Sequence, residues 1–145
     1  MQKNGLTRKL CVWLAALFLL TACDDSKPIV TIYHKEITQT PLPCMKLTVF
    51  PEEKDLSDTL MKLYPFKNDC PLVLSVSYKS SIHCNSGYNA CRQALGNFPT
   101  SYLKMELRRG LGLQYSYYID LKSKPDEADV QKGFERMEKD LKIGK

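Results

Sequence analysis

Six cysteines are the residues with the most chemistry to offer in this chain, and one of them lies in a distinctive setting. Cys23 follows Leu20-Thr21-Ala22, at the end of an apolar run that begins at Leu10. The run is about half of the roughly 20 residues that span a bilayer, and it is preceded by three cations and no acid: Lys3, Arg8 and Lys9. A basic start, a short apolar middle and small residues at the end are typical of an export signal.

An aliphatic residue, two small residues and a cysteine form the lipobox of bacterial lipoproteins. The thiolate of that cysteine accepts a diacylglycerol before the signal is cleaved, and palmitate is a typical acyl chain. We therefore predict a lipoprotein signal peptide over residues 1–22, lipid attachment at Cys23 and a tether over residues 23–27. The alternative is an ordinary signal peptide in which Cys23 stands by chance.

The predicted lipid places the domain on a membrane surface, facing the periplasm. In enteric bacteria an aspartate directly after the lipidated cysteine retains a lipoprotein in the inner membrane, and Asp24 occupies that position. Where this rule does not apply, we expect the outer membrane. The alternative is that Asp24 and Asp25 are only solvated linker residues.

Four cysteines remain after the signal and the lipid site are set aside: Cys44, Cys70, Cys84 and Cys91. An even number outside the cytoplasm predicts two disulfides, with three possible pairings. We favour Cys84–Cys91, which closes a short loop rich in turn residues, together with Cys44–Cys70. A zinc site that includes His83 is the alternative, but the chain has no C-x-x-C pair, and we predict no metal.

The charge of the whole chain overstates that of its predicted mature part. The signal holds three of the 21 lysines and arginines and none of the 16 acidic residues, so the 123 residues from Cys23 onward carry a formal charge of about +2. We find no block of basic residues and predict no nucleic-acid partner. The length predicts one domain, over residues 28–145.

Hydrophobic periodicity predicts how the chain positions these residues. Alternation or β-branched runs predict strands over residues 29–37, 45–49, 72–78, 103–108 and 111–121, and Gly110 makes the last two a hairpin. Helical spacing predicts helices over residues 53–64 and, after Pro125, along a stripe of Val130, Phe134, Met137 and Leu141. We therefore expect an α+β domain, with an antiparallel sheet of about five strands, two helices packed on one face, and disulfides.

Catalytic constellations are missing from the sequence. His34 and His83 are the chain's two histidines, and neither lies in a recognisable motif. No serine occupies a Gly-x-Ser-x-Gly turn, and no phosphate-binding loop or metal-binding helix is present. We predict that the protein is not an enzyme and needs no cofactor. A small envelope enzyme that uses His34 or His83 is an alternative.

The hairpin supplies the best candidates for contact with a protein partner. Tyr118 points away from Tyr115 and Tyr117, which we expect in the core, and an outward tyrosine is a good contact residue. Arg108 and Arg109 precede the turn, where ordinary solvation is the alternative role. Tyr88 is a further candidate, because it lies in the loop between two cysteines.

The segment Leu107–Asp120, together with the lipobox and the remaining cysteines, resembles immunity lipoproteins paired with type VI secretion phospholipase effectors. The resemblance implies a non-catalytic protein that binds an incoming lipase toxin in the periplasm and inhibits it. It assigns no inhibitory residue.

Other functions fit the same anchor and fold class. The main alternative is a structural accessory lipoprotein of a secretion or assembly machine in the cell envelope. An inhibitor of host lysozyme is disfavoured, because lysozymes are usually basic and this domain is not acidic.

Overall fold

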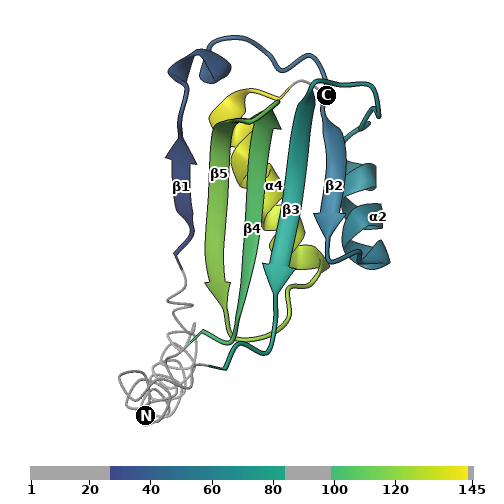
Figure 1. Cartoon of the computed structure of the whole chain (residues 1–145), viewed down its shortest axis with the longest axis vertical. Helices are drawn as coiled ribbons and strands as arrows, with labels where there is room; N and C mark the ends of the chain where they lie inside the picture. The colour runs from purple at the N-terminus through teal and green to yellow at the C-terminus, as the bar shows by residue number, and fades with distance from the viewer. Residues whose placement is uncertain (1–26, 84–98, 144–145) are drawn as a thin grey trace, which may run out of the picture.

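Alternating apolar residues build one five-stranded sheet in this protein, whose computed structural model describes residues 27–83 and 99–143 (Figure 1). The strands are β1 (Ile29–Ile32), β2 (Lys46–Phe50), β3 (Leu72–Lys79), β4 (Ser101–Arg109) and β5 (Gly112–Leu121). The helices are η1, a 3-10 turn (Lys35–Thr38), α2 (Lys54–Leu63) and α4 (Glu127–Leu141). The α+β class, the five strands and the two α-helices are confirmed in the described part of the chain.

The predicted antiparallel sheet is wrong in one respect, because the sheet is mixed. Its strand order is β1-β5-β4-β3-β2, and three neighbouring pairs are antiparallel, whereas β2 and β3 run parallel. The chain between β2 and β3 contains α2, which returns it to the end of the sheet where β2 began. A helical crossover of this kind makes the two strands parallel. Alternation along a strand identifies the strand and not its direction.

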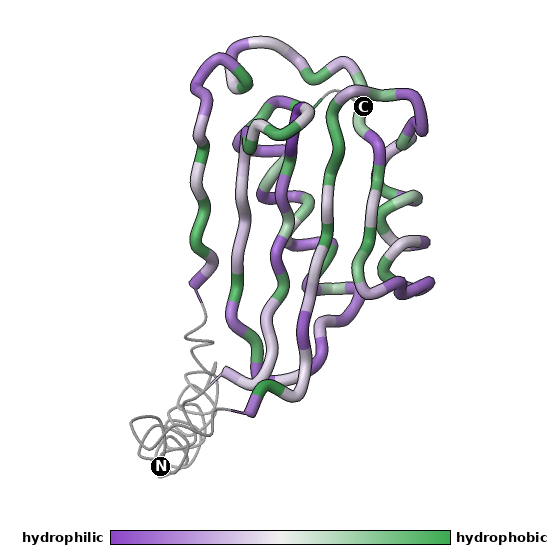
Figure 2. Tube along the Cα trace, in the orientation of Figure 1, coloured by the Kyte–Doolittle hydropathy of each residue, from purple (hydrophilic) through white to green (hydrophobic). Residues whose placement is uncertain are grey.

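Both α-helices lie behind the sheet in Figure 1 and cover the same face. Leu103, Met105 and Leu107 of β4 are fully buried on that face, and so are Phe134 and Met137 of α4. α4 begins directly after Pro125-Asp126, as predicted. Asp126 and Asp129 form a reciprocal capping box that fixes this start. Figure 2 shows the green apolar positions recurring along the strands that this layer covers.

Gly133 allows α4 to lie close to the sheet. A Cβ atom there would stand 3.0 Å from the Sδ of Met105 and 3.1 Å from the Cε1 of Tyr117. Glycine weakens a helix by about 1 kcal/mol relative to alanine. At this position it also provides the space in which a buried methionine and a buried tyrosine pack.

The first strand is shorter than the sequence predicts. The N–H of Tyr33 donates to the carbonyl of Gln114 at 2.9 Å, and β5 begins only two residues before Gln114. Beyond Tyr33 there is therefore little strand left to pair with, and the chain turns into η1, which buries Ile37 in the core. The β-branched run predicted the strand, but its partner's length sets its end.

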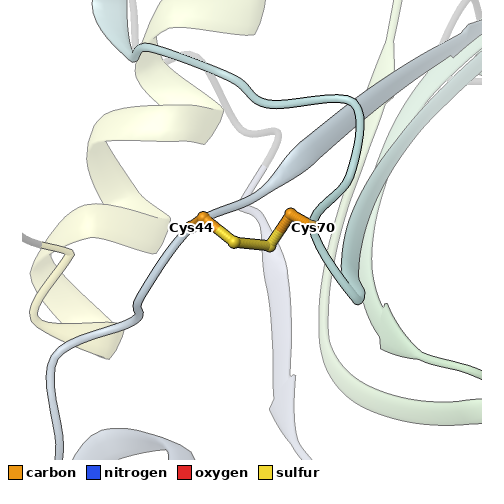
Figure 3. The surroundings of a disulfide bond; sticks show 2 residues. All are labelled: Cys44 and Cys70. Atoms are coloured by element: carbon orange, nitrogen blue, oxygen red, sulfur yellow. A yellow bond between two sulfur atoms is a disulfide. The ribbon is translucent and has the colours of Figure 1, made fainter.

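The disulfide Cys44–Cys70 is confirmed (Figure 3). The two cysteines precede β2 and β3, and parallel strands begin at the same end of a sheet. This arrangement brings residues 26 positions apart in sequence to a Cα–Cα distance of 5.9 Å. The predicted Cys84–Cys91 bond and the lipid site Cys23 lie outside the described residues.

Candidate functional site

The sheet face opposite the helices carries the polar and aromatic side chains of the strands. We call it the uncovered face, because no helix or strand of residues 27–83 and 99–143 packs on it. Cross-strand partners share a face, so the register places these residues on it together: Ile29 and Thr31 of β1, Ser116, Tyr118 and Asp120 of β5, Tyr102, Lys104, Glu106 and Arg108 of β4, Ser75, Ser77 and Lys79 of β3, and Thr48 and Phe50 of β2.

Two tyrosines form an aromatic pair on this face. The rings of Tyr102 and Tyr118 stack with centroids 5.6 Å apart and planes at 28°. The hydroxyl of Tyr118 donates to a carboxylate oxygen of Asp120 at 2.7 Å. Desolvation, followed by this hydrogen bond, raises the pKa of Tyr118 to about 12. The ring is therefore held in one orientation and keeps its proton at neutral pH.

A row of alternating charges runs along β4 beside the tyrosines. Glu106 forms ion pairs with Lys104 at 3.1 Å and with Arg108 at 2.9 Å. The glutamate side chain is only 15% exposed, whereas the two cations are 37% and 39% exposed. The carboxylate is thus neutralised beneath two cations, and the charge that a partner meets along this row is positive.

The ion pairs of Glu106 predict a pH dependence of stability. Partial burial acts to raise the pKa of this carboxyl, but hydrogen bonds and charges from Arg108 and Lys104 outweigh it and hold the pKa below 4.5. A carboxyl whose pKa is lowered by folding stabilises the fold above its unfolded pKa and loses that effect as the pH falls. We expect Glu106→Gln to cost about 0.5–1 kcal/mol at pH 7 and less at each step below pH 4.5.

Chemical denaturation at several pH values measures this difference. Glu135→Gln, which removes an exposed carboxylate from α4, is the control for loss of one negative charge. A difference between wild type and Glu106→Gln that stays constant from pH 7 to pH 3 would contradict the assigned role.

The structure separates the residues that the sequence placed together in the hairpin. Arg108 and Tyr118 lie on the uncovered face, as half-buried side chains. Arg109 is exposed beside the turn and lines a polar recess of about 290 Å³ with His34, Glu36 and Gln114. The β4–β5 register is irregular between Leu107 and Arg108, directly before the two arginines. The fourth candidate, Tyr88, lies outside the described residues.

Sequence reasoning missed several members of the uncovered face. Tyr102, Lys104 and Glu106 alternate with the buried residues of β4, so the alternation that predicted the strand also contained this signal. Three apolar or aromatic residues are also exposed: Phe50 at 74%, Ile29 at 63% and Tyr33 at 51%. They lie in or beside the two edge strands, and the sequence did not predict which strands form the edges.

The histidines, potential metal ligands and helices of the described residues bear on catalysis, metal binding and membrane insertion. His34 and His83 are both exposed, and residues 27–83 and 99–143 contain no group of three His, Cys, Asp or Glu side chains that could hold a metal ion. Among these same residues no helix is long and apolar enough to cross a membrane. Comparison of the chain with protein-family models, curated proteins and solved structures finds no match.

Proposed function

We propose that this protein is a lipid-anchored binding domain of the bacterial envelope, and that it binds and inhibits a type VI secretion phospholipase effector. The uncovered face carries the proposal of binding, since stacked tyrosines and an ion-paired row lie there without a covering element in the described residues. The partner class comes from the resemblance of Leu107–Asp120 to immunity lipoproteins. No catalytic residue is part of the proposal.

The size of the face supports a protein partner. Strands about 4.8 Å apart, with a rise of about 3.3 Å per residue, give this sheet a face of roughly 20 by 30 Å. That area, about 600 Å², is about three quarters of the roughly 800 Å² that each partner contributes to a standard protein interface.

The residue types on the face also support binding. Tyrosine and arginine are enriched among residues that dominate binding energy. Tyr118 is held by Tyr102 and Asp120, and Arg108 by Glu106, so little side-chain freedom is lost when a partner docks.

Anchoring explains how a small binding domain could protect a membrane. A lipid on Cys23 would hold the domain on the surface that a phospholipase attacks, and confinement there raises the effective concentration of the inhibitor. The tether between Cys23 and Ile29 spans at most about 20 Å. The domain would therefore meet the toxin within one protein diameter of the bilayer.

Co-purification tests the proposal, which expects a lipase to be encoded beside this gene. We expect the lipidated protein to retain the lipase, and Tyr118→Ala or Arg108→Ala to weaken binding at least tenfold, which corresponds to about 1.4 kcal/mol. Arg136→Ala is the matched control, because Arg136 also pairs with one carboxylate, Asp140 at 2.8 Å, but does so on α4. Equal loss in the Arg108 and Arg136 variants, or no recovered lipase, would contradict the proposal.

Labelled fatty acid tests the anchor in the same strains. The label should be present on the wild type and absent from Cys23→Ser, which should also leave cells sensitive to the toxin. A neighbourhood with a full set of envelope-machine components and no lipase would favour the accessory lipoprotein instead.

A further inference from the structure

The outer edge of β1 carries hydrogen-bonding groups that point away from the sheet. Tyr33 bonds Gln114, and in an antiparallel pair the bonded positions alternate, so Thr31 and Ile29 also face β5. The N–H and C=O groups of Val30 and Ile32 therefore point outward. No strand of residues 27–83 and 99–143 pairs with this side, as Figure 1 shows at its left edge.

β1 itself contains none of the charged residues or prolines that usually protect a sheet edge, although Pro28 stands directly before it. Ile29–Tyr33 contains no charge and no proline, and three of its side chains are well exposed: Ile29 at 63%, Tyr33 at 51% and Ile32 at 38%. The opposite edge strand, β2, begins with Lys46 and, like β1, has a proline directly beside it, Pro51. Charged residues on an edge strand hinder pairing with another strand, so β1, which has no charge, is the less protected of the two edges among the described strands.

From these features we propose that β1 pairs with β1 of a second copy of this protein, antiparallel and centred on Thr31. In this register Val30 of each copy lies opposite Ile32 of the other. Each such pair exchanges two backbone hydrogen bonds, so the two outward N–H groups and two outward C=O groups of each strand are all used. Thr31 lies opposite Thr31 of the second copy, as a pair without backbone bonds.

The side chains of this register match on both faces. On the uncovered face Ile29 meets Tyr33 of the second copy, and an aromatic side chain opposite a β-branched one is a favourable cross-strand pair. On the helix face Val30 meets Ile32. Ile29–Tyr33 contains no charged side chain, and the opposed lysines of this register, Lys27 and Lys35, lie outside the paired segment. The pairing would join two uncovered faces into one continuous sheet surface.

The small size of the contact predicts where the pairing is populated. About five residues from each copy bury much less than the roughly 1,200 Å² of a stable interface, so dilute protein in solution should be monomeric. Confinement to a membrane raises the effective concentration of copies. This part of the inference rests on the proposed lipid at Cys23, whereas the pairing itself does not.

Cysteine cross-linking of the full chain in cells tests the register. Thr31→Cys should give a covalent dimer on mild oxidation, because opposed residues without backbone bonds have Cα atoms about 4.5 Å apart, within the range for a disulfide. Thr48→Cys is the matched control, since Thr48 is also an exposed threonine in an edge strand, β2. We expect at least fivefold more dimer from Thr31→Cys; equal yields, or none from either, would overturn the proposal.

A charge swap in the Thr31→Cys background provides a second test. Ile29→Lys with Tyr33→Lys opposes like charges between the copies and should abolish the cross-link. Ile29→Lys with Tyr33→Glu opposes unlike charges and should retain it. Ile29 and Tyr33 are both exposed, so we expect the two variants to fold alike, which circular dichroism checks. Equal cross-linking in the two would overturn the register.

The anchor is separated from the pairing by adding Cys23→Ser. With the lipid removed, we expect the Thr31→Cys cross-link to fall at least fivefold at equal expression. If the cross-link forms although the wild type carries no fatty acid, the pairing stands and the proposed anchor fails. If the wild type is lipidated and the cross-link is absent, the pairing fails alone.

Discussion

Replacing Phe134 with alanine is expected to lower the free energy of unfolding by about 3–5 kcal/mol. Phe134 is fully buried on α4, and its ring centroid lies 6.2 Å from that of Tyr64 and 6.1 Å from that of Phe66. These rings join α4 to the segment that follows α2. Truncation removes the apolar contacts of this ring with Tyr64 and Phe66 and leaves a cavity between α4 and that segment.

Urea unfolding of wild type and variant measures this loss. Because a domain of this size is stable by about 5–15 kcal/mol, the transition midpoint should move to much lower urea. Met61→Ala on α2 is the control, since Met61 is 60% exposed and its truncation should cost less than about 0.5 kcal/mol. A Phe134→Ala midpoint as close to wild type as that of Met61→Ala would contradict the placement of this ring in the core.

Removing the Cys44–Cys70 disulfide is expected to cost about 3.5 kcal/mol. The bond closes a loop with a sequence separation of 26, and cross-linking a loop of that length reduces the entropy of the unfolded chain by this amount in the loop-closure model. The double change Cys44→Ala with Cys70→Ala is preferable to a single change, because it leaves no unpaired thiol to react.

Denaturation with and without a reducing agent measures the effect. Reduction should lower the free energy of unfolding of the wild type. The loss should be at least as large as the difference between the oxidised wild type and the double variant. Any further effect of reductant on the double variant reports the predicted Cys84–Cys91 bond, and peptide mapping identifies that bond directly. A double variant as stable as the oxidised wild type would show that the Cys44–Cys70 bond does not stabilise the fold.

Local patterns in the sequence predicted the elements that depend on neighbours along the chain. The alternation around Gly110 predicted the β4–β5 hairpin, and Gly110 has the positive φ of 58° that the turn requires. The stripe from Val130 to Leu141 predicted α4 and its buried side. Both patterns work because burial of one face imposes a fixed period on a strand or a helix.

Features that depend on distant segments were not predictable in this way. The parallel direction of β2 follows from the path of α2, and the end of β1 follows from the start of β5. Leu111 continues the alternation of β5, yet it is 99% exposed because it lies in the turn beyond the paired strands. Each case turns on which backbone is available as a partner, and a period of two carries no information about that.

The candidate site also has features that the sequence predicted and features that depend on tertiary structure. The sequence by itself predicted that Tyr118 and Arg108 are outward residues of strands and that Phe134 belongs to a buried stripe, and both hold in the structure. Only the tertiary structure decided that Tyr118 stacks on Tyr102, that Arg108 shares Glu106 with Lys104, and that both helices leave this face uncovered. The reason is physical. The periodicity of side chains is set by local backbone geometry, whereas the contacts of a side chain are set by strand register and by the face on which the helices pack.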